Sequence, residues 1–338
     1  MKISSGFLSA FFYMITNFAN GASIINGAGS TFAEPLYTKL FSEYQKNNKT
    51  SQFNYQGIGS GAGIKQLIAG TVDFAGSDDP IKAEDEAKAS SHVLHVPMAL
   101  GAVVVSYNLT LEKPLVLDGS TVAKIFNGTI TKWNHVDIAK LNPKLKLPDL
   151  AIAVATRADG SGTTAVFSEY LSKVSPEWVG KNGKTVDWFK GSLAAKGNAG
   201  VAGLIKQTPG TVGYVELIYA VENKLAYAQV VNKSGKIIDA NNTSVSAAAA
   251  SIKKEALEKE FRVSITDSND AKAYPISAFT WMLVFNKMPK EKGTAIIDFA
   301  KWAMSQPAQK IASEINYSAV PEEIRKEVLK KLSDVKFE

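Results

Sequence analysis

The sequence predicts an α/β fold made of two lobes. Predicted strands alternate with predicted helices, a pattern typical of sheets that are covered by helices on both faces. A length of 338 residues is too great for one comfortable core and favours two units of ordinary domain size. Two long apolar runs, at residues 93–107 and 276–285, are expected to cross between the units. We therefore predict a first lobe of residues 22–105 plus 275–338, and a second lobe of residues 106–274.

In the first lobe, short apolar runs and helical periodicity alternate from the start. Strands are expected at residues 24–25, 52–56, 72–76 and 93–107, and Pro97 makes the last of these one strand or two. Helices are expected at residues 33–46, 61–69 and 82–89. After the return crossing, amphipathic helices at residues 292–304 and 321–332 are expected to pack back on this lobe.

The second lobe is predicted to continue the alternation with shorter elements. Strands are expected at residues 151–155 and 212–215. Helices are expected at residues 120–126, 134–141, 165–171, 201–207 and 247–261. Residues 191–203 are rich in glycine and are interpreted as a loop.

The first 21 residues have the composition of a secretory signal peptide. Lys2 is their only charge, residues 7–15 are mostly apolar, and Ala19-Asn20-Gly21 offers small residues for a signal peptidase. The apolar run is too short to span a bilayer, which needs about 20 residues. We expect a mature chain that begins near Ala22 and is exported to the periplasm. The chain has no cysteine and so does not rely on disulfides, which suits an exported protein with an adequate core.

The composition excludes several classes of function. With 45% hydrophobic and 21% charged residues, the chain is an ordinary folded protein without a later membrane-spanning stretch. Its formal charge of +6 is spread thinly, without the basic stripe of a nucleic-acid-binding protein. Three histidines and no cysteine offer little for a closed metal site, so we expect no metal and no cofactor.

The segment Arg157-Ala158-Asp159-Gly160-Ser161-Gly162-Thr163-Thr164 carries the clearest functional signal. It lies between a predicted strand and a predicted helix, so several backbone N–H groups point at one place where the helix dipole favours an anion. Its hydroxyls add donors, and Arg157 adds a guanidinium suited to oxyanions, which Asp159 is placed to hold. An ordinary capped helix start with a surface arginine remains the alternative.

Two further glycine-rich segments precede predicted helices, Gly27-Ala28-Gly29-Ser30-Thr31-Phe32 and Gly57-Ile58-Gly59-Ser60-Gly61-Ala62-Gly63. Ligands of α/β sheets bind at the carboxyl ends of strands, where all three segments are expected. Together they favour a site that surrounds one small oxyanion with backbone and hydroxyl donors.

Asp78 is expected to end a strand at the same place. A carboxylate beside an anion is favourable when the ligand carries a proton that it accepts. Phosphate keeps at least one proton near neutral pH, whereas sulfate keeps none and would be repelled. The alternative, a turn-forming aspartate in Asp78-Asp79-Pro80, remains open.

These segments closely resemble the phosphate-binding periplasmic proteins of Pst-type ABC transporters (PstS). The resemblance also rests on Tyr55-Gln56, Val72-Asp73-Phe74, Leu115-Val116-Leu117-Asp118-Gly119, Leu141-Asn142-Pro143, Gly197-Asn198 and Pro209-Gly210 with Gly213-Tyr214-Val215-Glu216, and it covers the whole mature chain in order. The resemblance implies a class II periplasmic binding fold that closes on phosphate. It also implies a monomer without enzymatic activity, which delivers phosphate to a permease with its ATPase.

The resemblance also implies a set of phosphate-binding residues: Thr31, Phe32 through its backbone N–H, Ser60, Asp78, Arg157, Ser161, Gly162 and Thr163, with Asp159 in support of Arg157. Three positions depart from the family pattern. Thr156 stands where a second arginine is frequent, Ala33-Glu34 stands where a proline is common, and Asp79 adds a carboxylate. We expect these departures to affect affinity more than identity.

Two other classes of function are the alternatives. The first is a secreted phosphatase or esterase with Ser161 as the nucleophile, although the sequence offers no general base beside it. The second is a surface adhesin or scaffold that has kept the fold, which would show no change of melting temperature with ligand.

Overall fold

The computed structural model describes residues 22–250, 252 and 260–338. The predicted signal peptide, residues 1–21, lies outside the described residues, as does part of the predicted helix 247–261. Within the described residues, no helix combines the length and apolar character needed to cross a membrane.

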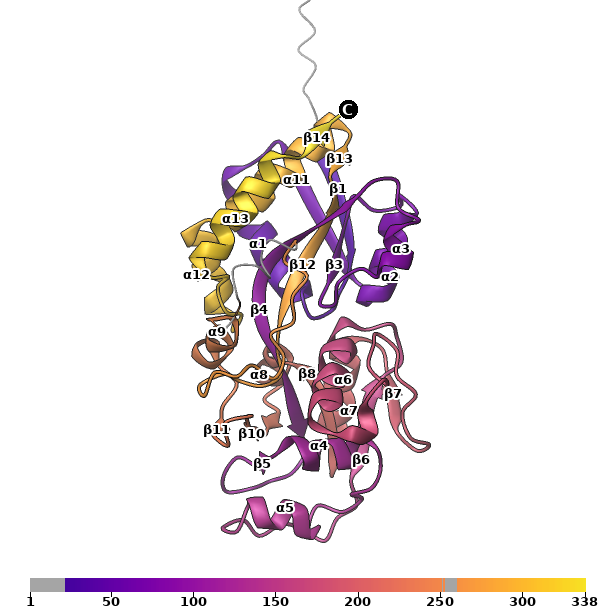
Figure 1. Cartoon of the computed structure of the whole chain (residues 1–338), viewed down its shortest axis with the longest axis vertical. Coiled ribbons are helices and arrows are strands. Elements are labelled where there is room, and N and C mark those ends of the chain that lie inside the picture. Colours follow the sequence, from indigo (N-terminus) through magenta and orange to yellow (C-terminus); the bar gives the residue numbers. More distant parts are fainter. Residues whose placement is uncertain (1–21, 251, 253–259) are drawn as a thin grey trace, which may run out of the picture.

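One large sheet runs through the molecule, with helices on its faces (Figure 1). Its strand order is β2-β1-β3-β12-β4-β8-β6-β7, and β9 pairs with β4. The strands are β1 (Ser23–Gly29), β2 (Ser51–Gly57), β3 (Phe74–Ser77), β4 (Val93–Tyr107), β6 (Ala153–Arg157), β7 (Leu193–Ala195), β8 (Thr211–Glu216), β9 (Ala226–Tyr227) and β12 (Ser277–Phe285). The predicted alternation of strands and helices is confirmed.

Strand β4 has different partners along its length and so joins two parts of this sheet. It pairs with β12 up to Ala102 and with β8 from Val103 onward, both antiparallel. Its residues 93–107 form one continuous strand, and Pro97 is accommodated where the register with β12 shifts between Thr280 and Trp281. We call the part of the molecule with β1, β2, β3 and β12 the first lobe, and the part with β6, β7 and β8 the second lobe.

The helices of the first lobe cover its part of the sheet, and the C-terminal helices lie along one side (Figure 1). They are α1 (Glu34–Asn47), α2 (Ser60–Ile68), α3 (Ala83–Glu86), α11 (Lys290–Ala303), α12 (Gln306–Glu314) and α13 (Glu322–Ser333). A small sheet of β13 (Lys287–Met288) and β14 (Lys336–Phe337) fastens the C-terminus there. The apolar face of α13 is buried through Ile324, Val328 and Leu332, so the predicted packing of the tail on the first lobe is confirmed.

The second lobe has shorter helices: α4 (Gly119–Phe126), α5 (Val136–Leu141), α6 (Gly162–Val174), the 3₁₀ turn η1 (Pro176–Trp178), α7 (Gly197–Gln207) and α8 (Leu217–Glu222). Helix α9 (Asn242–Ala250) lies against β4 and β12. A small sheet of β5 (Val116–Leu117), β10 (Gln229–Val231) and β11 (Ile237–Ile238) completes the lobe.

Three local predictions were wrong. The glycine-rich stretch 191–203 contains strand β7 and the first half of α7, because β7 gains its hydrogen bonds from β6 rather than from local propensity. Helix α9 begins at Asn242, and a helix cannot extend to Phe261 because Glu260 and Phe261 have φ angles of 62° and 59°. The strand predicted at residues 24–25 is longer than expected, since β1 extends to Gly29 and includes the glycine-rich Gly27-Ala28-Gly29.

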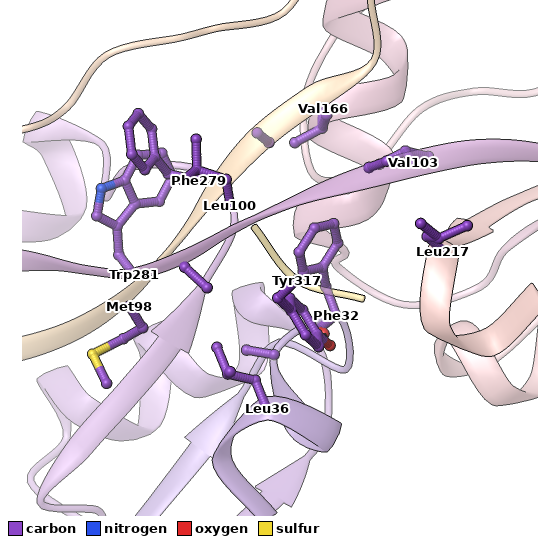
Figure 2. Packing of buried hydrophobic residues seen from close by; sticks show 14 of the residues in the cluster. Phe32, Leu36, Met98, Leu100, Val103, Val166, Leu217, Phe279, Trp281 and Tyr317 are labelled. Carbon is purple, nitrogen blue, oxygen red and sulfur yellow. The ribbon is translucent and has the colours of Figure 1, made fainter. Parts of the chain in front are cut away.

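Phe32 anchors the start of α1 in the core (Figure 2). Its ring is fully buried and meets the ring of Tyr317 edge-on, with centroids 6.1 Å apart. It also lies over Gly101 of β4, where a Cβ atom would come within 2.5 Å of the ring. A buried aromatic pair therefore fixes the backbone of residues 30–33 against the strand that joins the lobes.

Candidate anion-binding site

The site lies where the parallel strands of both lobes end. Strands β1, β2 and β3 of the first lobe are parallel, and so are β6, β7 and β8 of the second. Ser30, Ser60 and Asp78 follow the first three strands, and Arg157 ends β6. Because the carboxyl ends of parallel strands share an edge, residues far apart in sequence meet there. We call this boundary between the two lobes the seam.

Asp78 is the buried carboxylate of the site. Its Oδ2 accepts a hydrogen bond from Ser30 Oγ at 2.5 Å and its Oδ1 accepts one from Thr280 Oγ1 at 2.7 Å. Burial raises the pKa of Asp78 to about 6, against the lowering effect of these hydroxyls and of Arg157. With this pKa the group is mostly ionised at neutral pH, and its oxygens keep capacity to accept a further bond.

Arg157 is the buried cation. Only 1% of its side chain is exposed, and its Nε and Nη2 donate to the two carboxylate oxygens of Asp159 at 2.8 and 2.5 Å. Burial alone would raise the pKa of Asp159, but Arg157 lowers it below its usual value. This two-point pairing fixes the plane of the guanidinium and directs Nη1 toward Thr163 Oγ1, 3.5 Å away.

Asn198, the second residue of α7, joins the two lobes inside the site. Its Oδ1 accepts from the Glu216 backbone N–H, so its Nδ2 must face Thr31 Oγ1 and Thr163 Oγ1, at 3.0 and 3.1 Å. The Asn198 backbone N–H also donates to Thr31 Oγ1. One buried amide thus connects a hydroxyl of the first lobe with a hydroxyl of the second.

Glycines allow the two lobes to approach each other closely. The Gly162 N–H donates to Ser60 Oγ at 3.2 Å, and the Gly61 N–H donates to the Gly160 carbonyl at 2.9 Å. A Cβ atom on Gly162 would lie 2.5 Å from both Asp78 Oδ2 and Ser60 Oγ. A side chain at this position would therefore occupy the space between the donors of the site.

Three hydroxyls of the site are placed to donate to an anion. In the described part of the chain, the hydrogen-bond partners of Thr31 Oγ1, Ser60 Oγ and Thr163 Oγ1 are all N–H donors. Their oxygens act as acceptors, so each keeps its own proton for another acceptor. Together with Arg157, these groups form a concentration of donors that suits an oxyanion.

Two of the predicted residues have other contacts in this structure. The Phe32 N–H donates to Ser30 Oγ at 2.9 Å. Ser161 caps α6, its Oγ accepting from the Thr164 N–H at 3.0 Å. The structure brings Thr31, Ser60, Asp78, Arg157, Gly162 and Thr163 to the same seam through the contacts described above.

The three departures from the family pattern each have a partner. Glu34 Oε1 accepts a hydrogen bond from the Gly57 N–H at 3.1 Å, and this bond holds the Glu34 carboxylate at the end of β2. Thr156 is buried and donates to the Leu193 carbonyl of β7. Asp79 pairs with Lys184 across the seam.

Sequence reasoning did not assign roles to Ser30, Asn198 and Thr280. Ser30 lies in a glycine-rich segment and Asn198 in a motif of the resemblance, so a role for each could have been predicted from the sequence. Thr280 lies in the middle of β12 and meets Asp78 only through the pairing of β12 with β3, which the local sequence does not reveal.

Beside the anion-binding site, the described residues contain a sizeable cavity but no metal-binding cluster. No group of three or more His, Cys, Asp or Glu residues there is arranged to hold a metal ion. A cavity of about 270 Å³ lies beside Asp78, between α6 of the second lobe, β12 and residues 262–266.

Comparisons with known proteins agree with one another. Residues 16–307 match the family model described as a PBP superfamily domain. The chain is 41% identical over 309 residues to the phosphate-binding protein PstS of Pasteurella multocida, covering 90% of this chain and 88% of that protein. It is 40% identical over 310 residues to PstS of Haemophilus influenzae, covering 90% of both.

Solved structures share the fold at lower identity. A high-affinity periplasmic phosphate-binding protein solved with phosphate is 18% identical, with a TM-score of 0.73 over 90% of this chain and 92% of that one. This similarity confirms the predicted two-lobed α/β fold of a periplasmic binding protein.

Burial of Asp78 predicts a pH dependence of folding stability. Between the usual pKa of 3.8 and the folded value of about 6, the folded protein holds more protons than the unfolded chain. The free energy of unfolding should therefore fall as the pH rises through this range, by up to about 3 kcal/mol, and Asp78→Asn should remove this part. Urea unfolding of phosphate-free protein from pH 4 to about 8 measures it.

The exposed carboxylate Asp334 provides the control, because Asp334→Asn should leave the pH dependence unchanged. Parallel curves for the wild type and Asp78→Asn would contradict a buried, charged Asp78 in the folded protein.

Proposed function

The chain belongs to the PstS family of phosphate-binding proteins, and from this membership we propose that it binds inorganic phosphate between its lobes for import by an ABC transporter. The proposed ligand residues are Thr31, Phe32, Ser60, Asp78, Arg157, Ser161, Gly162 and Thr163, with Asp159 holding Arg157. The protein acts as a carrier and carries out no reaction on its ligand.

One observation supports this assignment above all others. Thr31 and Ser60 of the first lobe and Thr163 of the second accept N–H groups through their oxygens and retain their protons as donors. Thr163 also lies beside the Arg157 guanidinium, which Asp159 holds in a fixed plane. A tetrahedral oxyanion is the ligand that accepts from all of them at once.

Both lobes supply donors, so phosphate stabilises the closed arrangement. A ligand shifts such an equilibrium only by binding one state better than the other. Donors of the first lobe alone, or of the second alone, contact fewer of its oxygens. Capture of phosphate therefore brings the lobes together about β4, the strand that pairs within both of them.

Asp78 provides the discrimination against sulfate. Each of its oxygens already accepts one hydroxyl, and the carboxylate remains an acceptor at neutral pH. Phosphate brings a proton that this acceptor can take, whereas sulfate brings only negative charge into a buried site.

The rival enzyme hypothesis is not supported. The relatives are named binding proteins, and among the described residues no side chain accepts a hydrogen bond from the Ser161 hydroxyl, whose oxygen accepts from the Thr164 N–H. A turnover assay with a phosphate ester tests this, and hydrolysis that is lost in Ser161→Ala would restore the hypothesis.

The location and partners follow from the same proposal. We propose residues 1–21 as a signal peptide that directs the protein to the periplasm, where it works as a monomer with a permease and its ATPase. We also propose the lobes as residues 22–105 plus 275–338 and residues 106–274. The change of partner along β4, between Ala102 and Val103, supports a boundary near residue 105.

Replacing Arg157 tests the central cation. Arg157→Ala should weaken phosphate binding by roughly 2–5 kcal/mol, because it removes a desolvated partner of the anion and leaves Asp159 unpaired. Calorimetry on phosphate-stripped protein measures the change. Lys132→Ala removes the same charge from an exposed pair and should have little effect. Equal affinity in Arg157→Ala and the wild type would exclude the proposed role.

Asp78→Asn should narrow the difference in affinity between phosphate and sulfate. An amide can donate as well as accept, so the buried group would no longer reject a fully deprotonated anion. A competition titration of phosphate against sulfate measures the ratio. Unchanged selectivity would show that Asp78 does not discriminate between the ligands.

Gly162→Ala should prevent full closure and lower phosphate affinity at least about tenfold, since the added Cβ meets Asp78 and Ser60. Small-angle scattering should show compaction by phosphate in the wild type but less in this variant. Gly203→Ala is the matched control, because a Cβ there, on α7, meets nothing within 4 Å. Normal compaction in Gly162→Ala would contradict the proposed closed geometry.

A further inference from the structure

An ion pair between Lys184 and Asp79 crosses the seam beside the proposed phosphate site. Lys184 belongs to the second lobe, and Asp79 directly follows Asp78 in the first. The Lys184 Nζ donates to Asp79 Oδ2 and to the Pro80 carbonyl, the latter at 3.2 Å. The lysine side chain is 15% exposed and the aspartate side chain 32% exposed. Partial burial makes this pair stronger than one on an open surface.

Both members of the pair are tied to residues of the site. The Lys184 carbonyl accepts from the Ser161 N–H at 2.9 Å, which holds the loop of the second lobe that begins α6. Asp79 continues the chain from Asp78, and the Ser77 hydroxyl donates to its carbonyl. The pair therefore links the loop that carries Asp78 to the loop that carries Ser161.

Charge gives this link a consequence for anion binding. The negative charge of Asp79 raises the pKa of Asp78, although burial is the larger cause. An unpaired Asp79 would also repel an anion at the site. Lys184 neutralises that charge only when the lobes are closed, because the two side chains come from opposite sides of the seam.

We propose that Lys184 and Asp79 are positioning residues that hold the lobes closed and slow the release of phosphate. This inference rests on the proposed function. Formation of the ion pair and binding of phosphate both require the closed arrangement, so each favours the other. The pair contributes to affinity without contacting the ligand.

The pair is accessible to ions. Asp79, Pro80 and Gly183 line the cavity of about 270 Å³ beside Asp78. Salt should therefore screen the attraction between Lys184 and Asp79, and phosphate release from the wild type should become faster as ionic strength rises.

The test is the rate of phosphate release, measured by stopped flow with an excess of a competing phosphate trap. Lys184→Met should release phosphate about tenfold faster than the wild type, because it breaks the link and leaves Asp79 unpaired. The double variant Asp79→Asn with Lys184→Met should lie closer to the wild type, because the unpaired charge is gone. Lys184→Arg should restore slow release, and Lys132→Met is the control for loss of surface charge.

The salt dependence of the release rate provides a second readout, and this readout does not depend on the stability of either single variant. Between about 0.05 and 0.5 M salt, the release rate should rise more steeply in the wild type than in the double variant. Equal rates in the wild type and Lys184→Met, or equal salt dependence in the wild type and the double variant, would overturn the proposal while phosphate binding stands. Failure of wild-type protein to bind phosphate in calorimetry would instead overturn the proposed function and this inference with it.

Discussion

The pairing of β4 with two partners is the constraint on which the rest of the structure depends. Its residues up to Ala102 belong with β12, and those from Val103 belong with β8. A single continuous strand thus sets the first lobe and the second lobe edge to edge. Because the parallel strands on either side end at the same seam, the loops that follow them face one another. The site is a consequence of topology before any ligand is considered.

Hydrogen bonding at this seam follows from the need to satisfy buried polar groups. Asn198 has one orientation because a backbone N–H, which cannot accept, contacts its Oδ1. That orientation places its NH₂ group against the Thr31 and Thr163 oxygens, and so leaves both hydroxyl protons free to donate. The preference for an acceptor-rich ligand is therefore set by an amide outside the predicted ligand set. Asp78, with its hydroxyl partners Ser30 and Thr280, is the one acceptor that we assign to the site.

Much of the fold and of the site could be predicted from local sequence, and the remainder depended on tertiary pairing. The long strand at residues 93–107 was predicted with its observed bounds because a sustained apolar run needs no neighbour to be recognised. Strand β7 was missed because Leu193 and its neighbours gain their strand geometry from β6. The glycine-rich loops were found from composition, whereas Thr280 was not, since only the pairing of β12 with β3 brings it to Asp78.

The three departures from the family pattern show how the surroundings of a residue decide its effect. An extra carboxylate near an anion site is unfavourable by itself, yet Glu34 is bound to the Gly57 N–H and Asp79 to Lys184. In both cases a hydrogen-bond donor near the site binds the extra carboxylate and offsets its negative charge, although neither carboxylate is among the proposed ligand residues. The partner of Asp79 lies across the seam, so in our proposal its compensation exists only in the closed protein. On that proposal, a residue that weakens attraction in the open state favours closure, and the local charge balance is coupled to the motion of the lobes.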